Sequence, residues 1–479
     1  MTASDLFPLA AGLQRALADI VGSEHLLCSA AHRLAYARDR LPYGTFRLRE
    51  GALPGHLPAA VVLPADEAQL IALVQLAQRE RLPLIPFGAG SGVLGGTVPL
   101  LGRELVVDLK RLNRLLEVDA LNGTATVQAG LNGAQFEAAL NERGFTAGHY
   151  PQSITMSTVG GWAACRGAGQ ASSRYGKIED MVLGLKAVLP DGQRLVVRPV
   201  ARRSVGPSLK DLWVGSEGTL GFITELTLRI WRKPEFEQGQ VLAIPSLEAG
   251  LELLREVMQS ELRPQVARLY DAAESAARTE GVSGFDTQHP ILCILKFAGP
   301  RRLALLEAEL ALEIAARHGA RSAGSEPCTH WEATRFESYS TKWQTEGHHM
   351  DTIEVAAPWS ALPALYCSCR DAVRSLAEGV HFGVHWSHVY PEGACQYMTL
   401  RLPPMDAARA LALHRQAWDR VQRLTLDAGG SIAHHHGAGW FRGPWMAEEL
   451  GGGLPVLQAI KDALDPHNLL NPGKLGLRA

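Results

Sequence analysis

The sequence predicts an α+β fold of two domains, and three observations support it. The chain has 479 residues, too many for one compact hydrophobic core. Strand-like and helix-like segments alternate in short succession up to about residue 235. Beyond that point, long helices rich in Ala, Leu, Glu and Arg alternate with strand-like segments. We therefore divide the chain into a helical extension (1–55), a first domain (56–235), a second domain (236–428) and a segment that returns to the functional site (429–479).

The first domain opens with a strand, a helix and a strand over residues 56–90. Asp66 is placed to cap the helix, and Leu70, Leu73 and Leu76 follow at the spacing of one apolar helical face. Further strand-like and helix-like segments continue this alternation. In the second domain, helices are predicted at 247–258 and 301–319, and strands at 290–299 and 394–403.

The charge balance argues against nucleic acid as a partner. Lys and Arg total 47, whereas Asp and Glu total 49, so no strong overall field attracts a polyanion. The N-terminus lacks the basic and then apolar pattern of a secretory signal, which predicts a cytoplasmic location. The 7 cysteines are scattered without a metal-binding spacing, so we expect reduced thiols.

A glycine-rich loop follows the strand at 82–85. Gly88, Gly90 and Gly92 within it can take positive φ and allow a ligand to approach the backbone closely. Consecutive N–H groups in such a loop bind anions, and a pyrophosphate would suit it. The spacing is neither that of the dinucleotide motif nor that of the P-loop. A plain glycine-rich turn therefore stays an alternative for this loop alone.

Two further motifs extend the first domain. The segment 151–176 offers hydroxyls, backbone amides and glycines without a carboxylate, as a phosphate or ribityl chain would require. The segment 215–221, with the sequence GSEGTLG, is a second tight turn that leads into a strand. Together, the three motifs indicate one extended binding site for an anionic cofactor.

In this order, the three motifs resemble the FAD-binding domain of the vanillyl-alcohol oxidase and p-cresol methylhydroxylase superfamily, over about residues 55 to 235. The resemblance implies the two-domain fold of that superfamily, with an α+β substrate domain. Some members attach the flavin through a His in the first loop, but this loop carries Ser91, so we expect non-covalent FAD. The resemblance implies that the cofactor is bound by Pro86, Phe87, Gly88, Ala89, Gly90, Ser91, Gly92, Gln152, Ser153, Ser157, Thr158, Gly160, Gly161, Cys165, Arg166, Gly167, Ala168, Glu217, Gly218, Thr219, Leu220, Gly221 and Ile223.

Two His-rich segments in the second half select the branch of the superfamily. In the hydroxy-acid dehydrogenase branch, the corresponding segments resemble H-x-G-D-G-N-L-H and S-x-E-H-G, whose two His and one Glu bind a divalent metal. This chain keeps His388 but has Cys395 at the spacing of the second His, and His435 where the Glu stands. We therefore predict no metal.

The same segments are more similar to the alkyldihydroxyacetonephosphate synthase family. The resemblance runs from about residue 45 to the C-terminus. The motifs that carry it are Leu48–Gly51, Ser157–Trp162, Tyr175–Asp180, Arg268–Asp271, Ala357–Trp359, Tyr390–Tyr397 and His434–Gly437.

This second resemblance implies a reaction without net redox change. Flavin N5 would hold the ketone carbon of the substrate as a covalent adduct while an acid departs and a fatty alcohol enters. Tyr397 would be the acid or base for the C1 proton, with His434, His435 and His436 near the flavin or the substrate. Because a free Tyr has a pKa of about 10, we expect adjacent imidazoles or Arg268 to lower that of Tyr397. Clustered imidazoles should themselves stay neutral and serve as bases.

Alternatives stay open for each of these residues. The triple-His run could be a solvated loop or a metal site, and Tyr397 could be a half-buried strand aromatic. Arg268 could pair with Asp271 or hold a substrate anion. For the substrate phosphate, Arg335 or Lys342 could serve, or neither.

Three functions remain in competition. The first is a synthase-like transferase, the second is an FAD-dependent dehydrogenase or oxidase of a hydroxy acid or alcohol, and the third is an electron-relay flavoprotein subunit. The expected partners are a small or lipid-like substrate, a membrane surface touched peripherally, and a second copy of the chain in a homodimer.

Overall fold

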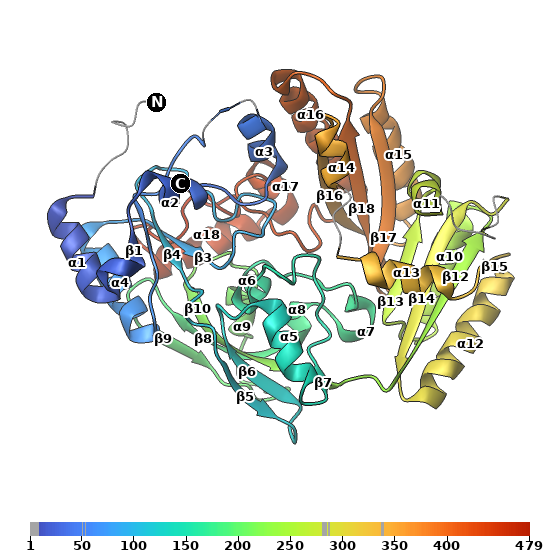
Figure 1. Cartoon of the computed structure of the whole chain (residues 1–479), viewed down its shortest axis with the longest axis horizontal. Helices are drawn as coiled ribbons and strands as arrows, with labels where there is room; N and C mark the ends of the chain where they lie inside the picture. The colour runs from blue at the N-terminus through green and yellow to red at the C-terminus, as the bar shows by residue number, and fades with distance from the viewer. Residues whose placement is uncertain (1–8, 50, 53, 280–284, 286–287, 337–339) are drawn as a thin grey trace.

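The computed structural model describes residues 9–49, 51–52, 54–279, 285, 288–336 and 340–479. Two domains lie side by side, and the N-terminal and C-terminal parts of the chain both pack on the first one (Figure 1). Helices and sheets are mixed in both domains. The predicted α+β fold class is therefore confirmed.

A small sheet in the order β1-β2-β4-β3 positions the first glycine loop. Strands β2, β3 and β4 are parallel, as expected for strands joined through a crossing helix. That helix begins at the predicted cap, because the Asp66 carboxylate accepts the N–H of Gln69 at 2.9 Å. Its predicted apolar face is buried. The elements are β1 (Leu26–Leu27), β2 (Ala60–Val62), α4 (Glu67–Glu80), β3 (Leu84–Phe87) and β4 (Leu105–Asp108).

A second, antiparallel sheet in the order β5-β6-β10-β8-β9 completes the first domain. Short helices on it carry part of the second motif, and the third motif is a turn that leads into the central strand of this sheet. A separate pair, β7 with β11, closes the domain. The elements are β5 (Leu115–Asp119), β6 (Thr124–Gln128), α5 (Gly133–Asn141), β7 (Phe145–Thr146), α6 (Val159–Ala164), α7 (Ser172–Tyr175), α8 (Ile178–Met181), β8 (Val182–Val188), β9 (Arg194–Val197), α9 (Lys210–Trp213), β10 (Phe222–Arg229) and β11 (Trp231–Arg232).

The N-terminal extension connects the two domains. It contains α1 (Ala11–Val21), η2 (Ser23–His25), α2 (Ala30–Ala35) and α3 (Pro42–Arg49). In α3, the Phe46 ring packs edge-on against His349 at 4.8 Å and His414 at 5.3 Å between centroids, and both partners belong to the second domain. The extension is thus part of the packed structure, because an aromatic side chain buried between domains contributes apolar area to both.

The second domain is built on a seven-stranded sheet in the order β15-β12-β14-β13-β17-β18-β16. Helices pack along it (Figure 1). The strands are β12 (Phe236–Ile244), β13 (Val266–Tyr270), β14 (Ile291–Gly299), β15 (Arg321–Ser322), β16 (His349–Pro358), β17 (His381–Val389) and β18 (Gly393–Leu402). The helices are α10 (Leu247–Gln259), α11 (Ala272–Thr279), α12 (Arg301–Arg317), α13 (Glu326–Thr334), α14 (Ser340–Thr345), α15 (Leu362–Arg374) and α16 (Ala407–Asp427).

After α16 the chain returns to the first domain. It passes through η3 (Gly443–Trp445), α17 (Met446–Leu450) and α18 (Gly453–Leu464). The tail then lies beside β3, where the N–H of Leu84 donates to the carbonyl of Leu469 at 2.7 Å and the N–H of Asn471 donates to the carbonyl of Leu84 at 2.8 Å. This return carries the triple-His segment to the boundary between the domains.

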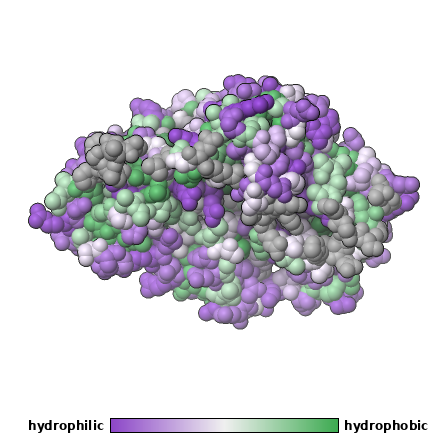
Figure 2. All heavy atoms as spheres, turned by 45° about the horizontal axis from the view of Figure 1, so that its top comes forward, coloured by the Kyte–Doolittle hydropathy of each residue, from purple (hydrophilic) through white to green (hydrophobic). Residues whose placement is uncertain are grey.

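The face of the molecule shown in Figure 2 is largely hydrophilic, with hydrophobic residues in small, separate groups. None of the described helices combines the length and the hydropathy that crossing a lipid bilayer demands.

Candidate active site

The first glycine loop and the second motif meet at Gly88, directly after β3. A Cβ on Gly88 would lie 2.3 Å from Oγ1 of Thr158, so only glycine permits this approach. The Thr158 hydroxyl also accepts the N–H of Gly161 at 3.3 Å and begins α6. Of the three glycines expected to be free for positive φ or for close approach, Gly90 has a φ of 59°. Gly88 and Gly92 do not have positive φ, and at Gly88 it is close approach to Thr158 that requires glycine.

The third motif packs against the first loop and against the returning segment. Gly218 has a φ of 76°, and a Cβ there would lie 2.6 Å from Cγ of Pro86. The Glu217 carboxylate accepts the N–H groups of Ala438 at 2.6 Å and Gly439 at 2.9 Å. The Glu217 side chain therefore fixes the segment that follows the triple His, and a contact with a cofactor would have to come from its backbone.

Several other side chains of the predicted cofactor set already bind protein atoms or lie in the core. The backbone of these residues, rather than the side chain, is left to face a cofactor. Ser157 accepts a hydrogen bond from Trp162 Nε1 at 2.8 Å, and Thr219 donates to the Ser216 carbonyl at 2.8 Å. Arg166 forms an ion pair with Glu179 at 3.2 Å. Leu220 and Ile223 are buried in the hydrophobic core.

Unpartnered polar atoms next to the three motifs fit an FAD molecule. Thr97 Oγ1, Ser216 Oγ and both ring nitrogens of His149 are buried without a hydrogen-bond partner in the part of the chain that the structure describes. Buried polar groups normally have partners. A Cβ on Gly167 would lie 3.9 Å from Nε2 of His149, which places this ring under the second motif. A pyrophosphate and ribityl chain could supply the missing acceptors and donors.

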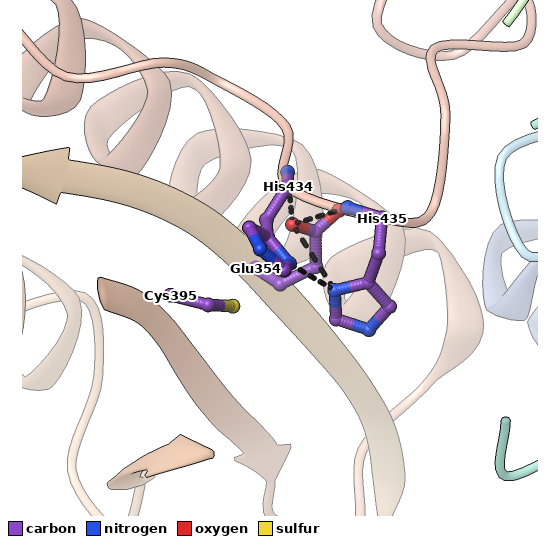
Figure 3. A group of neighbouring side chains, drawn as sticks. All are labelled: Glu354, Cys395, His434 and His435. Atoms are coloured by element: carbon purple, nitrogen blue, oxygen red, sulfur yellow. Dashed lines mark hydrogen bonds and ion pairs between the residues drawn. The ribbon is translucent and has the colours of Figure 1, made fainter. Parts of the chain in front are cut away.

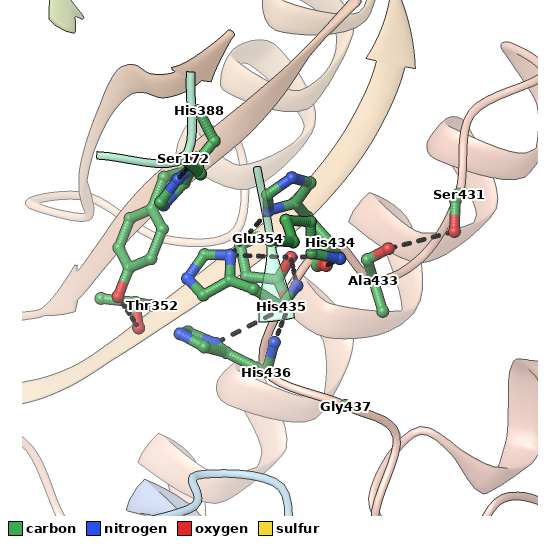
Figure 4. Close-up of polar contacts among 12 residues, drawn as sticks. Ser172, Thr352, Glu354, His388, Ser431, Ala433, His434, His435, His436 and Gly437 are labelled. Carbon is green, nitrogen blue, oxygen red and sulfur yellow. Dashed lines mark hydrogen bonds and ion pairs between the residues drawn. The ribbon is translucent and has the colours of Figure 1, made fainter. Parts of the chain in front are cut away.

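The triple-His segment is organised by one buried carboxylate. Glu354, on β16, accepts the backbone N–H groups of His434, of His435 at 3.3 Å and of His436 at 3.0 Å (Figure 4). Arg442 also donates to it, from Nη1 at 2.9 Å, and donates from Nη2 to the Glu354 carbonyl at 2.6 Å. Both side chains are fully buried. The loop is therefore held in one conformation by charge-assisted hydrogen bonds.

Tyr397 lies between the triple-His segment and a neighbouring strand. On β18 it is directly opposite Glu354 of β16 and His385 of β17, so the three side chains share one face of the sheet. Its ring stacks on His385 at 4.7 Å and lies 5.6 Å from the His436 ring. The hydroxyl donates to Oγ1 of Thr352 at 3.0 Å. The structure thus brings Tyr397 to the triple-His segment, which begins 37 residues later in the chain.

Burial raises the pKa of Tyr397, with further raising contributions from Glu354 and Cys395. This corrects the expectation that a nearby cation lowers it. The imidazoles that surround Tyr397 are not cations, because burial lowers the pKa of His434, His435 and His436. The expectation that these rings are neutral agrees with these pKa shifts.

Two arginine guanidinium groups, those of Arg268 and Arg335, contact the Trp331 ring. Arg268 donates from Nε to the Tyr270 hydroxyl at 2.7 Å, and its guanidinium lies 5.3 Å from the centroid of the Trp331 ring. The Arg335 guanidinium lies 5.7 Å from the same ring and 5.3 Å from the ring of Tyr150. The side-chain hydrogen bond of Arg268 goes to a neutral hydroxyl, and no ion pair joins either guanidinium to a carboxylate in the described part of the chain.

The alternative in which Arg268 pairs with Asp271 is wrong. The Asp271 carboxylate instead accepts the N–H of Glu274 at 2.9 Å and of Val384 at 3.0 Å. The side chain of Lys342, the other residue predicted for the substrate phosphate, lies outside the described part of the structure.

Glu354, Cys395, His434 and His435 bring one possible ligand atom each within 4.8 Å of one another (Figure 3). Metal ligands must be deprotonated and free. The Glu354 oxygens already accept from three N–H groups and Arg442, and burial raises the pKa of the Cys395 thiol well above its usual value. The contacts in this group match a hydrogen-bonded cluster better than a metal centre.

Sequence reasoning missed several residues of this cluster. Glu354 and Arg442 were not predicted, although a lone Glu in the apolar strand IEVAA is a visible anomaly. Lys177, which donates to the His434 carbonyl at 2.6 Å, and Tyr390 lie inside motifs noted for their resemblance but were given no role. Ser172 lies in the segment 151–176 that was noted for its hydroxyls, but no local pattern indicates that the fold brings it to the cluster from the first domain.

Comparisons with known proteins agree with this architecture. Residues 58–198 match the FAD binding domain, and residues 233–475 match the C-terminal domain of FAD linked oxidases. The chain is 30% identical over 464 residues to alkyldihydroxyacetonephosphate synthase of Dictyostelium discoideum, covering 90% of this chain and 75% of that protein. It is 29% identical over 483 residues to an uncharacterized FAD-linked oxidoreductase, YgcU, of Escherichia coli strain K12, covering 96% and 97%.

Solved structures show the same fold. A crystal structure of alkyldihydroxyacetonephosphate synthase superposes with a TM-score of 0.82 at 25% identity, covering 97% of this chain and 85% of that one. p-Cresol methylhydroxylase, at 13% identity, superposes with a TM-score of 0.78 and covers 98% and 96%, which shows the fold alone. The predicted two-domain flavoprotein fold and the predicted FAD cofactor are thereby confirmed.

Proposed function

The chain belongs to the FAD-linked oxidase family, and on that premise we propose that it exchanges the acyl group of an acylated phospho-ketone for a fatty alkoxy group. The observation that carries this proposal is the position of Tyr397, half-buried between the imidazoles of His385 and His436 and beside Glu354. A flavoprotein that only relays electrons has no need of such an acid–base cluster.

In this reaction Tyr397 would act as a protonated group. Because burial raises its pKa, it enters the reaction with its proton in place and can donate to a developing oxyanion or leaving group. The neutral imidazoles of His435 and His436 can accept a proton from carbon or from an alcohol. The His435 and His436 side chains are only 12% and 16% exposed, which limits access of water that would otherwise compete with the alcohol.

The substrate phosphate would be held by Arg268 and Arg335. Their guanidinium groups lie on a Trp331 ring and have no carboxylate partner among the residues described. A fork-shaped guanidinium binds phosphate with two parallel hydrogen bonds. Bound FAD would supply the redox-active ring on which the chemistry of this family takes place.

The proposal is tested with purified holoenzyme, palmitoyl-dihydroxyacetone phosphate and hexadecanol. We expect hexadecyl-dihydroxyacetone phosphate and free palmitate in equal amounts, detected by mass spectrometry. The Tyr397→Phe variant should form neither. As a matched control, Tyr366→Phe removes a hydroxyl that donates to Asp271 and should leave product formation unchanged. Absence of the alkyl product from the unaltered chain would refute the transferase.

The second candidate is a dehydrogenase or oxidase of a hydroxy acid or alcohol. The similarity to a bacterial FAD-linked oxidoreductase favours it, and a neutral imidazole could equally accept a hydroxyl proton. It predicts that an anaerobic sample loses its oxidised-flavin absorbance when a substrate is added. The transferase predicts no lasting loss of that absorbance, so the two functions are separated by one spectrum.

A cytoplasmic location, peripheral contact with a membrane and a homodimer stay predictions. A lipid-like alcohol as substrate is the reason to propose the membrane contact.

A further inference from the structure

A continuous chain of hydrogen bonds joins three imidazoles through two hydroxyl groups and crosses the boundary between the domains. Ser172 comes from α7 of the first domain, His388 from the end of β17 and Tyr390 from the residue that follows this strand, and His434 and His435 from the returning segment. In order along the chain, the bonds join His388 Nδ1 to Ser172 Oγ at 2.8 Å, Ser172 Oγ to the Tyr390 hydroxyl at 3.2 Å, that hydroxyl to His434 Nε2 at 3.0 Å, and His434 Nδ1 to His435 Nδ1 at 2.9 Å.

Each member of this chain can donate one proton and accept another. A neutral imidazole has one N–H and one lone pair, and a hydroxyl does both. Burial lowers the pKa of His388 to about 3 and that of His434 and His435 well below the usual value, so the rings are neutral. Burial also raises the pKa of Tyr390. All five groups therefore keep the protons that such a chain needs.

The distances permit two arrangements of protons, and both leave every group neutral. In one, Tyr390 donates to Ser172, as the geometry of that bond allows, and His435 donates to His434. In the other, every bond is reversed, which requires the Ser172 hydroxyl to turn and donate to Tyr390. Since His434 and His435 meet through their Nδ1 atoms, one must donate whenever the other accepts. The tautomers of His388, His434 and His435 are therefore linked.

We propose that this chain passes a proton between His388 and His435, with Ser172 and Tyr390 as positioning residues that connect the two ends. His388 and His435 leave Nε2 open, since no hydrogen bond reaches either atom within the described chain. Their rings lie 4.7 Å apart, so both ends can act on one substrate.

The proton balance of one passage is complete. In the arrangement in which Tyr390 donates to Ser172, His435 takes a proton at Nε2 and gives its Nδ1 proton to His434 Nδ1, and His434 gives its Nε2 proton to the Tyr390 hydroxyl. Tyr390 then gives its own proton to Ser172, Ser172 gives its own to His388 Nδ1, and His388 releases one from Nε2. One end has acted as a base and the other as an acid, and no charge is left in the buried cluster. That outcome avoids the large cost of a buried, unpaired charge.

This relay deepens the proposed function and rests on it for the reaction it serves. Exchange of an acid for an alcohol breaks the O–H bond of the alcohol and forms the O–H bond of the departing acid. A base and an acid are needed in the same site, and the linked tautomers supply both. Each turnover leaves the chain of hydrogen bonds in the reversed arrangement. Passage of one proton between His388 and His435 in the opposite direction restores the first arrangement.

The first test follows the histidine ring nitrogens by NMR in the full-length holoenzyme labelled with ¹⁵N-histidine. We expect Tyr390→Phe to shift the nitrogens of His388 as well as those of His434, although His388 does not bind Tyr390. Ser172→Ala should likewise shift His434. The His388→Gln and His434→Gln chains assign the signals. Tyr366→Phe should change neither ring. Shifts confined to the imidazole that lost its partner would overturn the relay.

The second test uses the transfer assay with palmitoyl-dihydroxyacetone phosphate and hexadecanol. Tyr390→Phe and Ser172→Ala should each lower kcat by about 10²-fold or more, as loss of acid–base assistance does, with KM changed less than about twofold. Because the two hydroxyls act in series, the double variant should lose no more than the worse single variant. Losses that multiply would contradict the relay. If the unaltered chain makes no alkyl product, the proposed function fails, and the NMR result decides the relay by itself.

Discussion

The glycine motifs of the first domain, predicted to cradle the flavin, and the triple-His cluster at the domain boundary are built by different physical means. The cradle depends on the absence of side chains. A Cβ on residue 88 would lie only 2.3 Å from Oγ1 of Thr158, so glycine is needed for the backbone to pass this close. The cluster depends on buried charge, because Glu354 holds three backbone N–H groups and Arg442. Several glycines close together form a pattern that can be recognised in the sequence. A single carboxylate such as Glu354, far along the chain from the residues it binds, forms almost no such pattern.

The largest expected effect is that of Glu354→Gln. The change leaves Arg442 buried without its counter-charge, and breaking a buried ion pair from one side costs about 3–5 kcal/mol. We expect a loss of that size in the free energy of unfolding, measured by urea titration. Glu252→Gln is the control, because its ion pair with Arg255 is exposed and such pairs contribute about 0–1 kcal/mol. Equal losses in the two variants would show that Glu354 does not organise the cluster.

The substitution Gly88→Ala tests whether the cradle needs close approach of the backbone at this position. The added methyl group collides with Thr158 Oγ1, and overpacking of this kind costs about 1–3 kcal/mol. Because this strain opposes the close packing that the FAD-bound protein needs, we expect FAD to bind about 10- to 100-fold more weakly. A titration that follows flavin fluorescence measures the affinity. The matched control is Gly55→Ala, because a Cβ there meets no described atom within 4 Å. Unchanged FAD affinity in Gly88→Ala would break the account of the cradle.

The neutral imidazoles predict how stability depends on pH. Burial lowers the folded-state pKa of His388 to about 3, below its unfolded value of about 6.5. Between these two values the unfolded chain binds the proton more readily, so stability falls as the pH falls through this window. The slope from one such group is about 1.4 kcal/mol per pH unit.

Unfolding free energies measured from pH 7 to pH 5 check this sign. The His388→Gln variant should have a shallower slope over that range, whatever its stability at pH 7. Substitution of the exposed His32 by Gln serves as the control. A slope that is the same in all three chains would mean that His388 is not held neutral.

The smallest effect is expected at Arg166, a residue predicted from the resemblance to bind FAD. Its side chain is 57% exposed and pairs with Glu179. An exposed pair contributes about 0–1 kcal/mol, so Arg166→Gln should change FAD affinity by less than about fivefold in a fluorescence titration. A loss as large as that of Gly88→Ala would show that the Arg166 side chain, and not only its backbone, belongs to the cradle.

The sequence predicted those features that local pattern controls. The cap at Asp66 and the buried face of α4 follow from residue type and helical spacing. The FAD domain follows from three glycine motifs in order. Tyr397 and the triple His were found because they lie in short motifs, but the expected direction of the Tyr397 pKa shift was wrong. That direction depends on burial and on Glu354, which lies 43 residues away in the chain.

The sequence by itself determined the two-domain flavoprotein architecture, because periodicity, caps and glycine turns act between near neighbours. Only the tertiary structure decided which groups share the site and which of them carry charge. β16 places Glu354 beneath the triple His, and α7 brings Ser172 to His388 from 216 residues away. The physical reason is that desolvation and hydrogen bonding act between neighbours in space, and the chain alone does not specify those neighbours.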